Sequence, residues 1–171
     1  MARTIGWSVL ALAAVAGALL WILGGRMAVH QADTAINGAP ERVFSYLTEP
    51  ELLTRWMGGL VESRPLGDGR LAIGARSREV IEDNGRRITV ESEVVGLEPG
   101  RLLAVNLTGD MFDIASRYRL EPAGPGTNLH HTLETRYKGV TRLFAPFLRG
   151  AVQRKVEADL ARLRAVVEGE M

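Results

Sequence analysis

The alternation of apolar and polar positions after residue 28 begins with one strand and two short helices. Residues 29–37 alternate with the period of a half-buried strand. Pro40 then fits the first turn of a helix, where the N–H that proline lacks would have no partner. A second proline, Pro50, opens another short helix, which Gly58 and Gly59 are expected to end.

Turn residues divide the middle of the chain into six further strands. Asn84 and Gly85 form the strongest hairpin signal, and other turns rich in glycine and proline separate the remaining segments. Such short connections join antiparallel neighbours. The expected strands span residues 60–66, 70–82, 86–97, 101–108, 111–121 and 127–138.

The last part of the chain predicts a long helix over residues 140–168, because its apolar residues recur every three or four positions. Pro146 is expected either to kink the first turns or to end a separate leading turn, and Gly169 is expected to stop the helix. The predicted fold class is therefore α+β. A seven-stranded antiparallel sheet wraps around the C-terminal helix, with two short helices after the first strand.

The period of two within each strand assigns the side chains that face this helix. Ile73 is placed inward at the start of its strand, and an inward Glu79 needs a partner or a proton because burying a lone charge is costly. Other polar residues share the inward face, which predicts either a mixed core or a lined cavity. The inward residues that can bind or react are Ser77, Glu79, Ser92, Phe112, Ser116, Tyr118, His131 and Tyr137.

Before the first strand, residues 4–25 contain no charged side chain. The 19 residues from 5 to 23 would rise about 28 Å as a helix, close to the roughly 30 Å of a hydrocarbon core. Trp7 and Trp21 fall near the two ends, where lipid–water interfaces favour aromatic rings. Residues 1–28 are thus predicted to be a transmembrane anchor and residues 29–171 a separate domain. A cleaved signal peptide is the alternative, although its apolar run is usually shorter.

The charges that flank this segment predict its orientation. Arg3 and the α-amino group precede it, whereas Arg26 follows it and Asp33 lies further on. The positive-inside rule then places the N-terminus in the cytoplasm. The expected protein is single-pass, with its domain on the extracytoplasmic side.

The charge balance and the absence of cysteine exclude several classes of function. Removing Arg3 and Arg26 from the 21 basic residues leaves 19, against 20 acidic residues, so the remainder carries a net charge of −1. Such a balance provides no surface for nucleic acid. Because the chain has no cysteine, thiolate catalysis, disulfides and cysteine-ligated metals are excluded.

Two segments of the chain resemble a known superfamily. In the run from residue 36 to 60 the matching positions are Ala39, Pro40, Val43, Phe44, Leu47, Pro50 and Trp56, with Glu49 where aspartate is commoner. The tail matches at Tyr118, Leu120, the Gly126-Thr127 turn, Leu160 and Leu163. This pattern resembles START-like helix-grip (SRPBCC) domains, which include the polyketide cyclase/dehydrase and lipid transport group. The resemblance covers about residues 29–168. It implies the fold but no single function, since these domains include lipid carriers, cyclases and ubiquinone-binding proteins.

His131 is the sharpest candidate for a functional group, because it points inward among apolar residues and a few polar ones. The alternative is a core histidine satisfied by one hydrogen bond. His130 and His131 are a poor metal pair, since adjacent strand residues face opposite ways. No sequence motif for a protease, a hydrolase, a phosphate loop or a dinucleotide site occurs, so no metal and no cofactor are expected.

The leading hypothesis is a membrane-anchored module that binds a hydrophobic small molecule or lipid between sheet and helix. The alternative is a cyclase or dehydratase that uses His131 as general acid or base, assisted by Tyr118 or Glu79. A third possibility is an interaction protein with a filled interior. The sequence indicates no oligomeric state. The residues expected to line the cavity are Trp56, Ser77, Glu79, Ser92, Phe112, Ser116, Tyr118, His131, Tyr137, Phe144 and Phe147.

Overall fold

The computed structural model describes residues 15–83 and 85–169 and contains one seven-stranded antiparallel sheet. Its strand order is β1-β7-β6-β5-β4-β3-β2, so consecutive strands from β2 to β7 are neighbours and β1 pairs with β7. The predicted antiparallel meander is confirmed. The strands are β1 (Ala28–Ile36), β2 (Leu60–Leu66), β3 (Arg76–Asp83), β4 (Arg86–Glu98), β5 (Leu102–Thr108), β6 (Phe112–Ala123) and β7 (Gly126–Tyr137).

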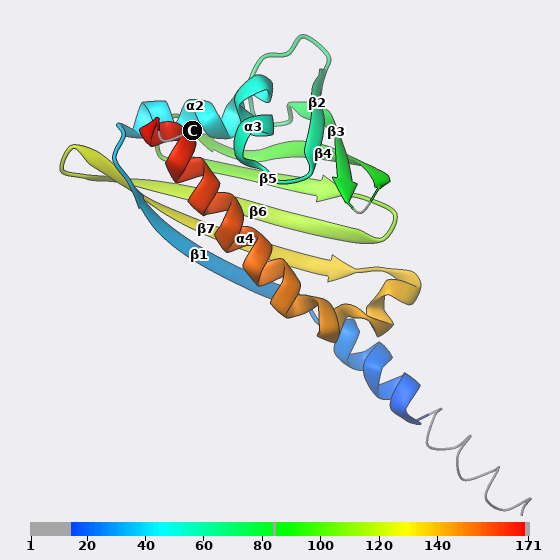
Figure 1. Ribbon diagram of the computed structural model, residues 1–171. Coiled ribbons are helices and arrows are strands. Elements are labelled where there is room, and N and C mark those ends of the chain that lie inside the picture. Colours follow the sequence, from blue (N-terminus) through cyan, green and yellow to red (C-terminus); the bar gives the residue numbers. More distant parts are fainter. Residues whose placement is uncertain (1–14, 84, 170–171) are drawn as a thin grey trace, which may run out of the picture.

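The labelled helices lie at one end of the sheet and across one of its faces (Figure 1). The short helices α2 (Pro40–Thr48) and α3 (Pro50–Trp56) follow β1 and begin at the two prolines, as predicted. The long helix α4 (Ala145–Glu168) crosses the sheet diagonally. A 3-10 helix, η1 (Gly139–Leu143), connects it to β7.

The packed core lies between the sheet and the C-terminal half of α4. Leu160, Leu163 and Val167 are buried there against Leu120 and Leu129. Side chains of α2 and α3 close the same end of the core. Since burying an aliphatic side chain contributes about 1.5–3 kcal/mol, this half of α4 holds the helix on the sheet.

One predicted strand starts six residues later than expected. The sequence pattern extends it from residue 70, but β3 begins at Arg76. Gly67, Gly69 and Gly74 have positive φ angles, which interrupt extended backbone, so residues 67–75 form a loop instead of a tight hairpin. Ile73 lies in this loop and not in the strand, and it is exposed to solvent, but it still lines the cavity described below.

The predicted single helix over residues 140–168 is also divided. Of the two expectations for Pro146, the structure has the separate leading turn: η1 ends at Leu143, and α4 begins at Ala145 with Pro146 in its first turn. Proline is tolerated there because the first N–H groups of a helix have no partner. Gly169 ends α4 in the left-handed conformation, as expected.

Residues 15–24 are helical and extend away from the domain beside η1 (Figure 1). The predicted membrane span over residues 5–23 therefore lies partly outside the described residues. Within the described ranges, no helix combines the length and the apolar character needed to cross a membrane.

Candidate ligand cavity

A cavity of about 1440 Å³ lies between the inner face of the sheet and the N-terminal half of α4. Strands β3 to β7 supply alternate residues to its wall, and the loop over residues 67–75 borders it. On the helix side the wall is formed by Leu148, Ala151, Val152, Lys155, Val156, Asp159 and Arg162. The cavity exists because this part of α4 does not pack directly against the sheet.

Most of the candidate residues chosen from the sequence line this one cavity. Strand alternation brings them together from β3, β4, β6 and β7, because side chains two residues apart share a face. They are Ser77, Glu79, Ser92, Phe112, Ser116, Tyr118, His131 and Tyr137.

Three other candidates lie elsewhere. Trp56 is buried in the core, where its indole N–H donates to the carbonyl oxygen of Tyr46 at 2.8 Å and its ring meets Tyr118 edge-on. Phe144 and Phe147 are 61% and 72% exposed and do not line the cavity. The break between η1 and α4 changes the phase of the helix, which turns both phenylalanines outward.

His131 is held between two polar residues of the neighbouring strand. Its ring stacks on Tyr118 at 4.1 Å between ring centres and 10° between planes. Its Nε2 lies 2.9 Å from the Ser116 hydroxyl. The other nitrogen, Nδ1, is buried and has no hydrogen-bond partner among the described residues. Because His131 lines the cavity but Nδ1 itself is buried, a bound molecule can bond to this nitrogen only if the surrounding side chains move.

Burial sets the charge of this histidine. Loss of hydration lowers the pKa of His131 to about 4, with the Asp159 carboxylate opposing part of the change. The imidazole is therefore neutral at pH 7, with one N–H donor and one acceptor. Burial also raises the pKa of the Tyr118 phenol, which stays protonated.

Glu79 supplies a second polar group to the wall. It is 8% exposed, and its carboxyl oxygen accepts a hydrogen bond of 2.9 Å from the Ser92 hydroxyl. The structure thus places Glu79 inward with a partner. Burial raises the pKa of its carboxyl, and the bond from Ser92 opposes that shift only in part.

Sequence reasoning missed a third polar group, which is centred on Asp159 of α4. Its carboxylate is buried and pairs with Lys155 at 2.7 Å and with Arg162. It also accepts a hydrogen bond from the backbone N–H of Gly58, whose carbonyl accepts one from Lys155. Lys155 and Arg162 border the cavity. Their spacings of four and three residues from an aspartate would have indicated this cluster.

His130 lies on the opposite side of β7 from His131, where its Nδ1 is 2.8 Å from a carboxylate oxygen of Asp33. Across the described residues, no group of three or more histidine and carboxylate side chains is arranged to hold a metal ion.

Residues 27–168 match the family described as polyketide cyclase/dehydrase and lipid transport. The chain belongs to this family. The match includes every strand and the whole of α4, so the family accounts for the fold in which the cavity lies. None of the curated proteins compared with the chain matches it.

Solved structures with the same fold come from several bacteria. SA2116 from Staphylococcus aureus has a TM-score of 0.69 at 14% identity, covering 85% of this chain and 96% of its own. TTHA0849 from Thermus thermophilus has 0.63 at 24% identity, covering 81% and 96%. The di-domain ARO/CYC StfQ of the steffimycin biosynthetic pathway has 0.68 at 16% identity, covering 84% of this chain and 51% of its own. At these identities the likeness shows the fold alone.

Proposed function

We propose that this protein is a membrane-anchored member of the family that binds a hydrophobic small molecule or lipid between the sheet and α4. The observation that carries the proposal is the cavity of about 1440 Å³, whose wall is mostly apolar with a few convergent polar groups. Ligand pockets in proteins usually enclose about 300–1,000 Å³, so there is room for a lipid-sized molecule.

The polar groups determine how such a ligand would be oriented. The imidazole of His131 is neutral and its buried Nδ1 has no partner, and the Glu79 carboxyl lies on the same inner face. A hydroxyl or carbonyl group on the ligand would satisfy Nδ1 once the neighbouring side chains move aside, and the apolar part would fill the remaining space. We therefore expect an uncharged amphiphilic ligand.

Catalysis of the cyclase or dehydratase type would use the same cavity residues, His131 and Tyr118, and the contact between them is compatible with it. A general acid or base works best when its pKa lies near the working pH. The pKa of His131 is lowered to about 4. This favours binding over proton transfer as the role of His131, and the open cavity argues against an interaction protein with a filled interior.

The membrane anchor over residues 5–23 is part of the proposal and rests on the uncharged N-terminal run. Its flanking charges support a domain on the extracytoplasmic side. A thiol reagent that does not cross membranes should then label a Pro125→Cys variant in intact cells. Labelling only after lysis would show that the domain lies in the cytoplasm.

The ligand hypothesis is tested by extracting the full chain, purified in mild detergent, and identifying bound molecules by mass spectrometry. We expect a lipid or isoprenoid enriched over an unrelated single-pass protein. Ala151→Trp, whose larger side chain would project into the cavity, should lose most of it. Ala161→Trp adds the same ring on the exposed side of α4 and should retain it. Absence of any enriched ligand, or equal retention by both variants, would contradict the proposal.

A further inference from the structure

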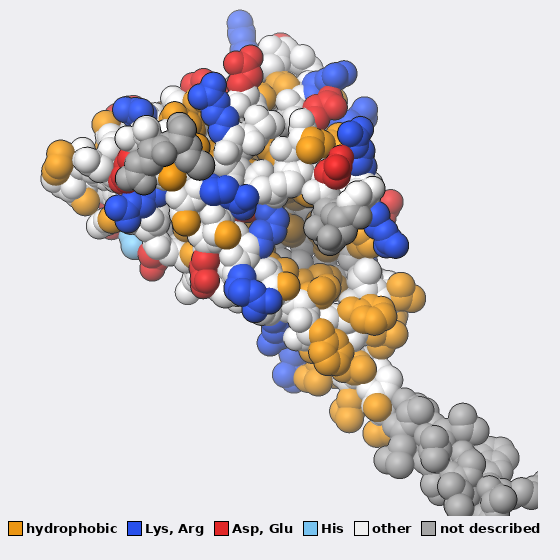
Figure 2. Space-filling view, viewed as in Figure 1, with side chains coloured by type: hydrophobic (Ala, Val, Ile, Leu, Met, Phe, Trp, Pro, Cys, Tyr) orange, Lys and Arg blue, Asp and Glu red, His pale blue; other side chains and the backbone are white. Residues whose placement is uncertain are grey.

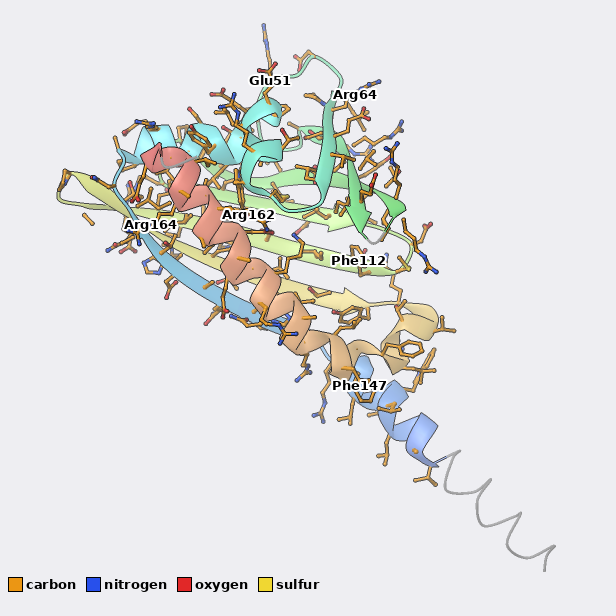
Figure 3. The ribbon with its side chains drawn as sticks, viewed as in Figure 1. Glu51, Arg64, Phe112, Phe147, Arg162 and Arg164 are labelled. Carbon is orange, nitrogen blue, oxygen red and sulfur yellow. The ribbon has the colours of Figure 1, made fainter. Side chains whose placement is uncertain are left out.

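Apolar side chains are exposed together at the end of the domain where η1 and α4 begin. Val140 is 70% exposed, and Phe144, Phe147 and Leu148 are also exposed. Figure 2 shows apolar side chains gathered at this end, beside the N-terminal helix, and Figure 3 places Phe147 there. We call these four residues the apolar end. Exposed aromatic and aliphatic clusters of this kind mark surfaces that contact another apolar phase.

The apolar end is joined to the helical residues 15–24. The Arg142 guanidinium lies over the ring of Trp21, 4.7 Å from its centre. A Cβ atom on Gly24 would lie 1.6 Å from the Arg142 carbonyl oxygen, so only glycine allows the helix to approach η1 this closely. The exposed Ile22 and Leu23 thereby continue the apolar end into the segment that carries no charge from residue 4 onward.

The stretch of chain that contains the apolar end carries only positive charges. No acidic residue occurs from residue 135 to residue 156, whereas six arginines and lysines do. Lys138 pairs with Asp113 and Lys155 with Asp159, while Arg149 and Arg154 are exposed in the two turns of α4 that follow Phe147. An apolar surface bordered by cations complements a bilayer with anionic headgroups.

The apolar end also borders the cavity. Leu148 belongs to both, and Thr141 of η1 lines the cavity as well. Met111 lies across from them, exposed and lining, with its carbonyl oxygen bonded to the Thr141 hydroxyl at 2.9 Å. A surface pressed against η1 and the start of α4 would therefore contact exposed residues of the cavity wall.

We propose that the apolar end inserts into the lipid–water interface of an anionic bilayer, so that the cavity opens toward the lipids. The domain is then seated on the membrane through η1 and α4 and is not merely tethered to it. As a route for ligand entry this rests on the proposed function, but the seating itself is a separate property.

The absence of cysteine from the chain permits a direct measurement with single nitroxide labels. Phe147→Cys and Val140→Cys report on the apolar end, and Pro125→Cys, in the exposed β6–β7 turn, is the control. The full chain is reconstituted into vesicles of phosphatidylcholine and phosphatidylglycerol. Collisions of each label with oxygen, which concentrates in lipid, are compared with those of a water-soluble nickel chelate.

At residues 140 and 147 we expect a ratio of oxygen to nickel collisions several-fold higher than at residue 125. Equal ratios at all three positions would overturn the proposal. If a second copy of the chain covers this surface, the label at 147 will instead show dipolar broadening that vanishes on dilution with unlabelled protein, without a gain in oxygen collisions. That result would also overturn it.

Two further measurements test the role of lipid charge and separate membrane insertion from ligand binding. In vesicles of phosphatidylcholine alone the ratio at residue 147 should fall, and an unchanged ratio would refute the choice of an anionic surface. Mass spectrometry of bound ligand is independent of the labels. If the label at residue 147 lies in lipid but no ligand is bound, the proposed function is refuted and the insertion into the membrane stands. If a ligand is bound but the label stays in water, the insertion is refuted and the proposed function stands.

Discussion

His131 illustrates how position in a strand determines chemistry at the scale of one residue. Its place on the inner face of β7 buries it against Tyr118 and Ser116, and the lost hydration lowers its pKa to about 4. A histidine is cationic below a pKa of about 6.5 when solvated. This one stays neutral through most of the acidic range, at a cost that depends on pH.

The cost predicts a pH dependence of stability. Below pH 6.5 the unfolded chain takes up a proton at residue 131 that the folded chain refuses until about pH 4, so the free energy of unfolding falls as the pH falls through this window. The difference between the two pKa values corresponds to about 3 kcal/mol. His131→Gln, which does not titrate, should lose this part of the dependence. Urea unfolding of the full chain in mild detergent at pH 7 and pH 4 measures it.

Glu79 changes the pH dependence of stability in the opposite direction to His131. The His131→Gln variant is therefore needed as a reference. The raised pKa of Glu79 stabilises the folded state at low pH, and this contribution is lost as the pH rises above the ordinary value of 4.5. The two groups partly cancel in the natural chain. If the natural chain and His131→Gln lose equal stability between pH 7 and pH 4, burial of a neutral His131 is refuted.

At the scale of elements, the inward faces of the strands were more predictable than the exposed face at the start of the long helix. Alternation placed Ser92, Ser116 and His131 inward correctly, because the pleat gives a fixed period of two whatever the strand packs against. Phe144 and Phe147 fitted an apolar helical stripe equally well. The change to α-helix at Ala145 shifted their phase, and a short 3-10 turn leaves no signature in apolar spacing. The loop with Ile73 was missed because glycines at positive φ interrupt a pattern that otherwise reads as a strand.

Close approach of two elements makes one glycine indispensable. A Cβ atom on Gly126, at the start of β7, would lie 2.5 Å from the backbone oxygen of Ile36 in β1. Gly126→Ala should therefore destabilise the fold by about 1–3 kcal/mol, as overpacking in a core does. Gly150→Ala is the matched control in α4, where the nearest atom is a flexible Arg154 nitrogen at 3.4 Å.

For Gly150→Ala we expect a gain of about 0.5–1 kcal/mol, because alanine is the better helix former. Urea unfolding of both variants should thus shift in opposite directions from the natural chain. A destabilised Gly150→Ala together with an unaffected Gly126→Ala would show that β1 and β7 do not approach as closely as described.

For the whole molecule, the sheet and α4 divide the interior into two halves with different roles. The C-terminal half of α4 packs on the sheet and supplies Leu160, Leu163 and Val167 to the core. The N-terminal half stands over the cavity and ends in exposed aromatic residues. The family resemblance found in the sequence predicted this architecture. It did not predict which half of α4 borders the cavity, because that depends on contacts between residues far apart in the chain.

The same division predicts that the domain folds without the N-terminal segment. β1 begins at Ala28, and the main core cluster contains no residue before Ala32. Contacts that would be lost with residues 1–26, such as that of Trp21 with Arg142, lie outside that cluster. Deleting residues 1–26 should therefore give a folded domain that high salt removes from the membrane fraction. Cell fractionation and circular dichroism measure the two properties.

The exposed apolar end predicts a second property of the truncated domain, which is binding to anionic membranes. Without the anchor, Phe144 and Phe147 should still bring the domain to anionic vesicles, with an affinity that falls as salt screens Arg149 and Arg154. A double variant, Phe144→Ser with Phe147→Ser, should abolish this binding without unfolding the domain, because both side chains are already exposed. A truncated domain that is unfolded, or that stays in the membrane fraction with both phenylalanines replaced, would contradict the division between anchor and domain.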